Sequence, residues 1–284
     1  MNRVFVLAIW LGYFVPLYGQ HWECRTVDAS TGAPIAYANI GIIGKDIGTV
    51  SDESGKFQLS GLLPKFAGDT LRCSTLGYCH TDLVLAAGME MPDELRLQPC
   101  AAILPEVQVV AANFKKQKRL GHSSSSKKIV FYFMSNKLGT ELASKIEVKK
   151  GPVSVVQAQF NIAENKFEEV LFRINIYDID PKTNLPGNKI LKEEVIVKAN
   201  RNSETMAVDL RPYNIVVERD FVLSLEWIKA LNGGKITEDL KFCAALSSKR
   251  NVFIKKTSQS AWKAFDDKKM GLHAGVCFSV DVKY

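Results

Sequence analysis

Residues 31–57 read TGAPIAYANIGIIGKDIGTVSDESGKF, and this stretch decides the fold of the N-terminal part of the chain. Residues 35–40 alternate in a period of two, which predicts a half-buried β-strand. Asp52 and Gly55 occupy the first and last positions of the four residues DESG, a pattern that is typical of a type I turn. The stretch therefore predicts two short strands and a tight turn.

The same stretch and a later Gly-Tyr pair carry a resemblance to a known family. The matching positions are Thr31, Gly32, Pro34, Ile35, Tyr37, Ala38, Asn39, Gly48, Thr49, Ser51, Asp52, Gly55, Phe57, Gly77 and Tyr78. The segment resembles the carboxypeptidase-like regulatory domain of secreted and outer-membrane proteins of Bacteroidota, over roughly residues 23–110. The resemblance implies a small transthyretin-like or Ig-like β-sandwich. It implies no peptidase activity, because the family name describes an accessory domain of carboxypeptidases.

Residues 103–110 are predicted to form the last strand of this first domain. They resemble the strand that precedes the plug in starch-utilisation-type TonB-dependent transporters. Residues 129–284 are too few for a plug and a large outer-membrane barrel. An accessory partner of a TonB-dependent uptake system therefore stays open as an alternative function.

Residues 1–20 have the features of a signal peptide. Arg3 is the single charge, and residues 4–15 are apolar or nearly so. Such a run is too short for a membrane helix, which needs about 20 residues, but it suits the apolar region of a secretory signal. We expect an exported protein in the periplasm, on the outer membrane or outside the cell.

The net charge of +7 is concentrated in residues 111–128, AANFKKQKRLGHSSSSKK, which carry six basic residues and no acidic one. This composition predicts a flexible linker. A sharper alternative is peripheral membrane contact, in which the linker meets phosphate-bearing lipid heads. Nucleic-acid binding is not expected, because this basic segment contains only one aromatic residue for base stacking, Phe114.

Residues 129–284 contain long alternating runs, which predict a second antiparallel sandwich. Clear examples are 170–177, 221–228 and 276–283, each with one apolar and one mixed face. This part resembles the C-terminal half of many small Bacteroidota regulatory-domain proteins, which implies a jelly-roll-like sandwich. The likeness is carried by Phe172, Arg173, Asn175, Ile176, Tyr177, Pro186, Gly187, Val208, Asp209, Leu210, Tyr213, Val217, Leu225, Glu226 and Trp227. The whole chain is thus predicted to be all-β, with β-sandwich domains at 21–110 and 129–284.

The six cysteines leave several pairings open, and buried free thiols are the alternative to disulfides. Cys243 and Cys277 both fall on the mixed faces of their predicted strands, so a cross-strand Cys243–Cys277 disulfide is a candidate. No CxxC motif occurs, and no histidine has a second ligand at a recognised spacing. We therefore expect no metal and no cofactor.

Motifs for catalysis are missing from the sequence. It contains no H-x-x-E pair, no G-x-S-x-G elbow and no P-loop. Its paired carboxylates are adjacent, so on a strand the two members of a pair point to opposite faces. The alternative is a glycan-acting hydrolase whose site is dispersed over loops.

Three aromatic residues, Trp262, Tyr213 and Tyr177, are candidates for a sugar-stacking platform. Trp262 lies between polar residues and is the best candidate for an exposed ring, whereas Trp227 shares its parity with core leucines and is expected in the core. The sequence therefore favours a non-enzymatic binding or scaffolding protein for an envelope protein or glycan.

Overall fold

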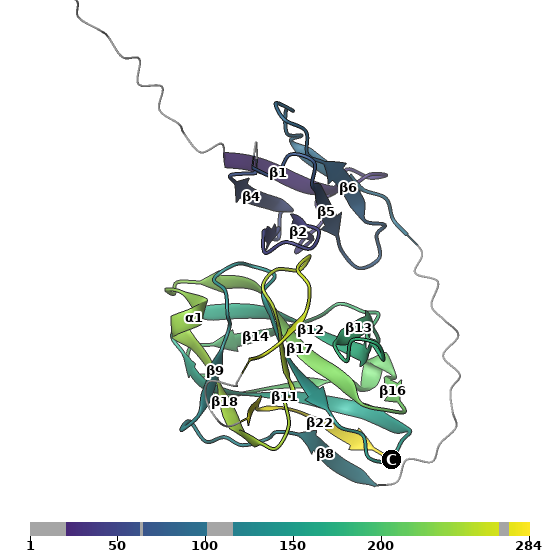
Figure 1. Ribbon diagram of the computed structural model, residues 1–284, viewed down its shortest axis with the longest axis vertical. Coiled ribbons are helices and arrows are strands. Elements are labelled where there is room, and N and C mark those ends of the chain that lie inside the picture. Colours follow the sequence, from purple (N-terminus) through teal and green to yellow (C-terminus); the bar gives the residue numbers. More distant parts are fainter. Residues whose placement is uncertain (1–20, 63–64, 101–115, 267–272) are drawn as a thin grey trace, which may run out of the picture.

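The computed structural model describes residues 21–62, 65–100, 116–266 and 273–284, and these residues form two β-sandwiches (Figure 1). The predicted all-β fold with two sandwiches is confirmed. The signal peptide at 1–20 and the strand expected at 103–110 lie outside the described residues. In the described part of the chain, no helix is long and apolar enough to cross a membrane.

The first domain packs a three-stranded sheet on a four-stranded sheet. The sheet orders are β4-β1-β7 and β3-β2-β5-β6, with β1 parallel to β7 and antiparallel to β4. The strands are β1 (His21–Asp28), β2 (Asn39–Ile42), β3 (Gly48–Val50), β4 (Lys56–Ser60), β5 (Thr70–Ser74), β6 (Thr81–Val84) and β7 (Glu94–Leu97). The core between the sheets includes Trp22 and Phe57, whose rings meet edge to face at 5.1 Å.

The strand expected at residues 35–40 begins only at Asn39. Tyr37 has a positive φ of 53°, and this left-handed residue shifts the alternation by one position. Ile35 is buried before it, and Ala38 and Ile40 are buried after it. A period-two reading could not foresee this, because it assumes an extended backbone throughout.

The predicted turn at Asp52 and Gly55 is confirmed. The Gly55 N–H donates to the Asp52 carbonyl at 3.0 Å, and the Asp52 carboxylate accepts backbone N–H groups of Ser54 and Lys56, each at 2.8 Å. Gly55 has φ +76°, a conformation that glycine adopts without strain. The turn therefore delivers the chain directly into β4.

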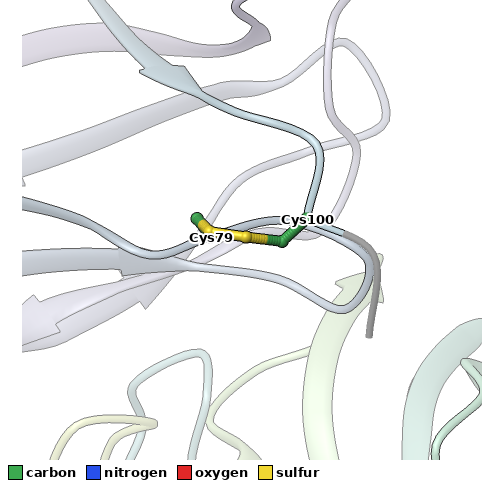
Figure 2. The surroundings of a disulfide bond; sticks show 2 residues. All are labelled: Cys79 and Cys100. Carbon is green, nitrogen blue, oxygen red and sulfur yellow. A yellow bond between two sulfur atoms is a disulfide. The ribbon is translucent and has the colours of Figure 1, made fainter. Parts of the chain in front are cut away.

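A disulfide between Cys79 and Cys100 joins the segment before β6 to the segment after β7 (Figure 2). Backbone hydrogen bonds accompany it, from Cys79 to the Gln98 carbonyl and from Cys100 to the Gly77 carbonyl, each at 2.9 Å. Among the described residues, the other four cysteines are free and buried, at positions 24, 73, 243 and 277.

The second domain packs a seven-stranded sheet on an eight-stranded one. The first has the order β13-β12-β17-β10-β19-β20 with β14 added on β12; the second has β21-β18-β11-β22-β8, with β15 and β16 on β11 and β9 on β18. The elements are β8 (Gln117–Gly121), β9 (Val130–Tyr132), β10 (Glu141–Ile146), β11 (Val153–Asn165), β12 (Glu169–Ile179), β13 (Pro186–Lys189), β14 (Val195–Asn200), β15 (Thr205–Asp209), η1 (Arg211–Tyr213), β16 (Val216–Val217), β17 (Phe221–Leu231), α1 (Ile236–Asp239), β18 (Leu240–Ser247), β19 (Val252–Lys255), β20 (Lys263–Ala264), β21 (His273–Val276) and β22 (Phe278–Lys283).

The apolar faces predicted for this domain form its core. They supply Val170, Phe172, Ile174, Ile176, Phe221, Leu223, Leu225, Trp227, Val276, Phe278, Val280 and Val282. Trp227 is in this core, as expected.

The expectation of a flexible linker at 111–128 is wrong for residues 117–121. They form β8, which pairs antiparallel with β22 and carries a bidentate Arg119–Asp281 ion pair at 2.8 and 2.9 Å. The Asn161 amide then donates to the Ser123 and Ser124 carbonyls at 3.1 and 2.9 Å. The strand needs little apolar burial of its own, because the edge of β22 satisfies its backbone groups.

The Cys243–Cys277 disulfide is not formed in the structure. Both thiols are free and buried, and both lie outside the main core cluster, as their parity indicated. The Cys277 N–H donates to the Cys243 carbonyl at 2.8 Å, so the two residues are neighbours on adjacent chain segments. Their pairing stays a prediction.

Candidate functional site at the domain junction

The β2–β3 loop of the first domain inserts polar backbone groups against the second domain. The Lys45 carbonyl accepts from the Thr257 and Ser260 hydroxyls at 3.3 and 3.1 Å, and the Gly44 N–H donates to the Gln259 carbonyl at 2.9 Å. An ion pair between Lys256 and Asp46 at 3.0 Å lies beside these bonds. The two domains therefore meet through specific polar contacts.

A row of four charged residues crosses the seven-stranded sheet on the face turned away from the core. Arg173 of β12 lies opposite Glu226 of β17, Glu226 lies opposite Glu141 of β10, and Glu141 lies opposite Lys255 of β19. Exposed fractions are 6% for Arg173, 2% for Glu226 and 1% for Glu141. We call these four residues the charged row.

Arg173 connects the charged row to the first domain. Its guanidinium donates to Glu226 at 3.0 Å, to Glu194 at 2.9 Å and to the Tyr37 carbonyl at 2.5 Å. Tyr37 is the residue with positive φ in the first domain, so its unusual backbone presents a carbonyl to this cation. The planar guanidinium can make all these bonds at once, which an ammonium group could not.

Glu141 is saturated with hydrogen bonds. It accepts from the Asn175 amide at 2.8 Å, from the Tyr177 hydroxyl at 2.9 Å and from the Ser224 hydroxyl at 2.5 Å. Lys255 adds a cation at 3.9 Å. Neighbouring side chains of the sheet thus engage this carboxylate, which leaves it little capacity to act on a substrate.

The surrounding charges set the titration behaviour of the row. Burial would raise the pKa of Glu226, but Arg173, Lys189 and Lys255 outweigh it and hold that pKa below its ordinary value. Burial and the nearby Glu141 raise the pKa of the Tyr177 hydroxyl well above its ordinary value. Glu226 thus remains charged and Tyr177 neutral near neutral pH.

The structure brings two of the three predicted binding aromatics together. Tyr177 and Trp262 meet edge to face at 5.5 Å beside the charged row, with the Lys255 ammonium 5.3 Å from the Trp262 ring centre. Tyr177 is buried, and Trp262 is half-buried rather than exposed. Tyr213 belongs to η1 and packs against the main core, away from the other two. The predicted platform of three rings is therefore not assembled, and binding by these residues stays a prediction.

A groove of 860 Å³ opens between the two domains, and we call it the junction groove. Its first-domain side carries Glu23 and Arg25 of β1 and Gln58 of β4, all on the exposed face of the three-stranded sheet. Tyr37 and Trp227 also line it, one from each domain. The contacts of Arg173 and the β2–β3 loop help to hold together the two domains that form the groove.

The lining of the junction groove contains a core tryptophan and charged side chains from both domains. The Trp227 side chain is 8% exposed, and its indole N–H has no partner among the described residues. The indole nitrogen is itself buried and the ring belongs to the main core, so this N–H is not offered to a ligand in the groove. The lining also contains Asp93, Lys56 and Lys229, of which Lys229 is paired with Glu53 across the junction.

A smaller cavity of 210 Å³ lies at the Arg173 end of the charged row. Arg173, Asn175 and Lys189 line it from the second domain, and Asn39 lines it from the first. The Asn39 side-chain oxygen is buried and has no partner among the described residues. This cavity is too small for a polymeric ligand and is separate from the junction groove.

Sequence reasoning missed the charged row. The mixed faces of the runs at 170–177 and 221–228 contain its arginine and one glutamate, but their opposition depends on strand register. The sequence feature that could have indicated the row is the presence of single charged residues, Arg173 and Glu226, within runs that are otherwise rich in apolar residues. Within the described residues, no group of three His, Cys, Asp or Glu residues is placed to hold a metal ion.

Comparisons with known proteins support one of the two domains. The sequence model of the CarboxypepD_reg-like domain matches residues 25–110. A comparison with curated protein sequences finds no significant match. Among solved structures, the cysteine protease and lectin-like domains of Cwp84, a surface layer associated protein of Clostridium difficile, align over 59% of this chain with 6% identity and a TM-score of 0.43. The Gx strain structure of infectious bursal disease virus aligns over 93% with 9% identity and a TM-score of 0.29.

These structural scores are too low to support an argument. The chain spans 36% of the Cwp84 structure and 64% of the viral chain. The sequence match and the observed sandwich agree with the resemblance seen in residues 31–57. The first domain of this chain is a CarboxypepD_reg-like domain.

Proposed function

We propose that the protein is a non-enzymatic binding protein of the cell envelope that holds a glycan or protein segment in the junction groove. The observation that carries this proposal is the groove itself, which is lined by residues of both domains. Its volume of 860 Å³ falls within the range of about 300–1,000 Å³ typical of ligand pockets. Envelope localisation rests on the signal-like residues 1–20.

The chemistry of the groove suits a ligand with many oxygen atoms. Arg25 offers planar donors and Asp93 an acceptor, and the Gln58 amide and the Glu23 carboxylate, which are hydrogen-bonded to each other at 2.5 Å, have further donor and acceptor positions for hydroxyls or peptide groups. Lys229 lines the groove from the opposite domain, where it is paired with Glu53. Such a ligand would contact both domains at once.

The buried carboxylates favour a structural role over catalysis. Glu141 and Glu226 are the carboxylates that converge on the charged row, yet both are almost fully buried and are held by Asn175, Arg173 and their neighbours. A general acid or base must reach the proton it transfers. This arrangement supports the proposal that the row fixes the domains and leaves binding to the groove.

The proposal is tested by screening the protein against a glycan array and against fractionated envelope protein. The variant Arg25→Ala/Gln58→Ala should weaken binding of any captured ligand about tenfold or more, since a lost bond to the charged Arg25 contributes about 1.5–3 kcal/mol and one to the neutral Gln58 about 0.5–1.5 kcal/mol. Lys182→Ala is the matched control, because Lys182 is exposed and lies in the β12–β13 loop away from the groove. Equal binding by the double variant would overturn the groove assignment, and a reaction product would overturn the non-enzymatic role.

A further inference from the structure

A second pocket of 270 Å³ opens at one end of the second domain, and we call it the end pocket. Its floor is apolar: Val153 and Val282 belong to the main core, and Leu120 and Val148 pack against that core. The pocket is thus an opening into the space between the two sheets. β8, which supplies Leu120, lies on the side of the second domain away from the first (Figure 1).

Three lysines surround this apolar opening. Lys118 of β8 has the same parity as Leu120, so its side chain lies on the pocket side of the strand. Lys149 and Lys150 line the pocket from the loop after β10. All three are exposed, and none forms an ion pair with a carboxylate of the described residues.

The only acidic side chain in the lining is already neutralised. Glu147 forms an ion pair with Lys249 at 2.7 Å. The rim therefore has a local excess of positive charge over an apolar floor. A ligand that complements it has an anionic head and a hydrocarbon tail.

We propose that the end pocket docks the protein on an anionic membrane surface by taking in part of one lipid acyl chain while its lysines contact phosphate heads. The pocket is below the usual range of about 300–1,000 Å³ for sites that enclose a whole ligand. The remainder of the ligand stays outside, as a lipid does when it remains in its bilayer. This inference is independent of the proposed function of the junction groove.

The location of the end pocket fits this role. β8 and the C-terminus, which contribute to its lining, lie on the side of the second domain away from the first domain (Figure 1), and the end pocket shares no lining residue with the junction groove. Docking there would therefore leave the junction groove free. The composition of residues 111–128 predicts that peripheral membrane contact, if it occurs, involves this whole basic segment. Among the described residues of that segment, only Lys118 and Leu120 line the end pocket, together with Lys149 and Lys150 from the loop after β10.

The test is co-sedimentation of the full chain with phosphatidylcholine vesicles, with and without phosphatidylglycerol. Lys118→Glu/Lys149→Glu/Lys150→Glu should lower the partition coefficient on anionic vesicles by about a hundredfold, since each lysine near an anionic surface contributes roughly a factor of five. The control Lys128→Glu/Lys182→Glu/Lys192→Glu changes the same net charge at exposed lysines away from the pocket. Equal losses in both triple variants, or equal binding to both kinds of vesicle, would overturn the proposal.

A second pair of variants tests whether the apolar floor of the end pocket takes in an acyl chain. Val148→Asp introduces one negative charge at the pocket, and Val84→Asp introduces the same charge at a position that is 63% exposed on the first domain. The Val148 variant should bind anionic vesicles at least fivefold more weakly than the Val84 variant. Equal binding by the two, or tight binding of a fluorescent fatty acid without any vesicle binding, would show that no membrane lipid enters the pocket.

Discussion

Glu141 and Glu226 lie directly opposite each other on β10 and β17, and both carboxylates are buried on the sheet face turned away from the main core. Like charges in this position repel each other. Here Asn175 donates to both carboxylates, at 2.8 and 3.3 Å, and Arg173 and Lys255 flank them on the outer strands. The two carboxylates are thus flanked by one cation on each side, and loss of either cation leaves a buried carboxylate without its neighbouring positive charge.

Removing the cation at one end should therefore be costly. We expect Arg173→Met to lower the free energy of unfolding by about 3–5 kcal/mol, because it leaves Glu226 buried without its partner and removes the bond to the Tyr37 carbonyl. Urea unfolding followed by circular dichroism measures this loss. The double variant Arg173→Met/Glu226→Leu should recover part of it, because no uncompensated charge remains. Unchanged unfolding of the single variant would mean that the row is not a stabilising unit.

Stability should also depend on pH through Glu226. Because Arg173, Lys189 and Lys255 hold its pKa in the folded state below the unfolded value, the folded state binds fewer protons as the solution is acidified. The contribution is fully present above the unfolded pKa of about 4.3 and is lost as pH falls through the lower folded pKa. In a series from pH 7 to pH 3, the contribution of Glu226 to the melting temperature should be constant down to about pH 4.3 and fall only below it. Glu226→Gln should be less stable at pH 7 but show a shallower fall, and parallel curves would contradict the assignment.

The sequence was sufficient for the layers but not for the junction. Alternation along 221–228 and 276–283 correctly assigned the core faces, because burial between two sheets imposes a period of two. On the opposite faces of these strands, polar, charged and apolar residues alternate without a pattern that identifies their partners. Their charged row depends on which residues lie opposite each other on four strands, and that register follows from long-range pairing which a local pattern does not record.

Two local features explain the remaining differences. Tyr37 adopts φ 53°, and this one residue moves the start of β2 and turns a carbonyl toward Arg173. Residues 117–121 have the composition of a linker, yet they complete a sheet because the edge of β22 is available to them. In both cases a neighbour that is distant in sequence decides the conformation.

The turn before β4 offers a test of the stretch that decided the fold. Gly55 has φ +76°, and a methyl group there would meet the Thr26 carbonyl oxygen at 2.5 Å. Gly32 has φ +72° but open space around it. Gly32→Ala should cost about 1–2 kcal/mol for the left-handed backbone alone, and Gly55→Ala should cost about 1–3 kcal/mol more through the close contact. Urea midpoints of the two variants measure the difference, and equal midpoints would mean that the turn can shift away from Thr26.

Counting free thiols distinguishes the Cys243–Cys277 disulfide suggested by the sequence from the structure, in which both of these cysteines are free. The structure has one disulfide, Cys79–Cys100, and four free buried thiols in its described residues. Burial raises the pKa of Cys277 to about 11, and it also raises the pKa of Cys243, so little reactive thiolate forms at pH 8. A thiol reagent should thus label almost nothing in the native protein and four thiols in unreduced protein unfolded in urea. Cys243→Ser should lower that number by one. If Cys243 and Cys277 are instead bonded to each other, only two thiols should be labelled in the unfolded wild-type protein. Cys243→Ser should then raise that number to three, because it frees the Cys277 thiol.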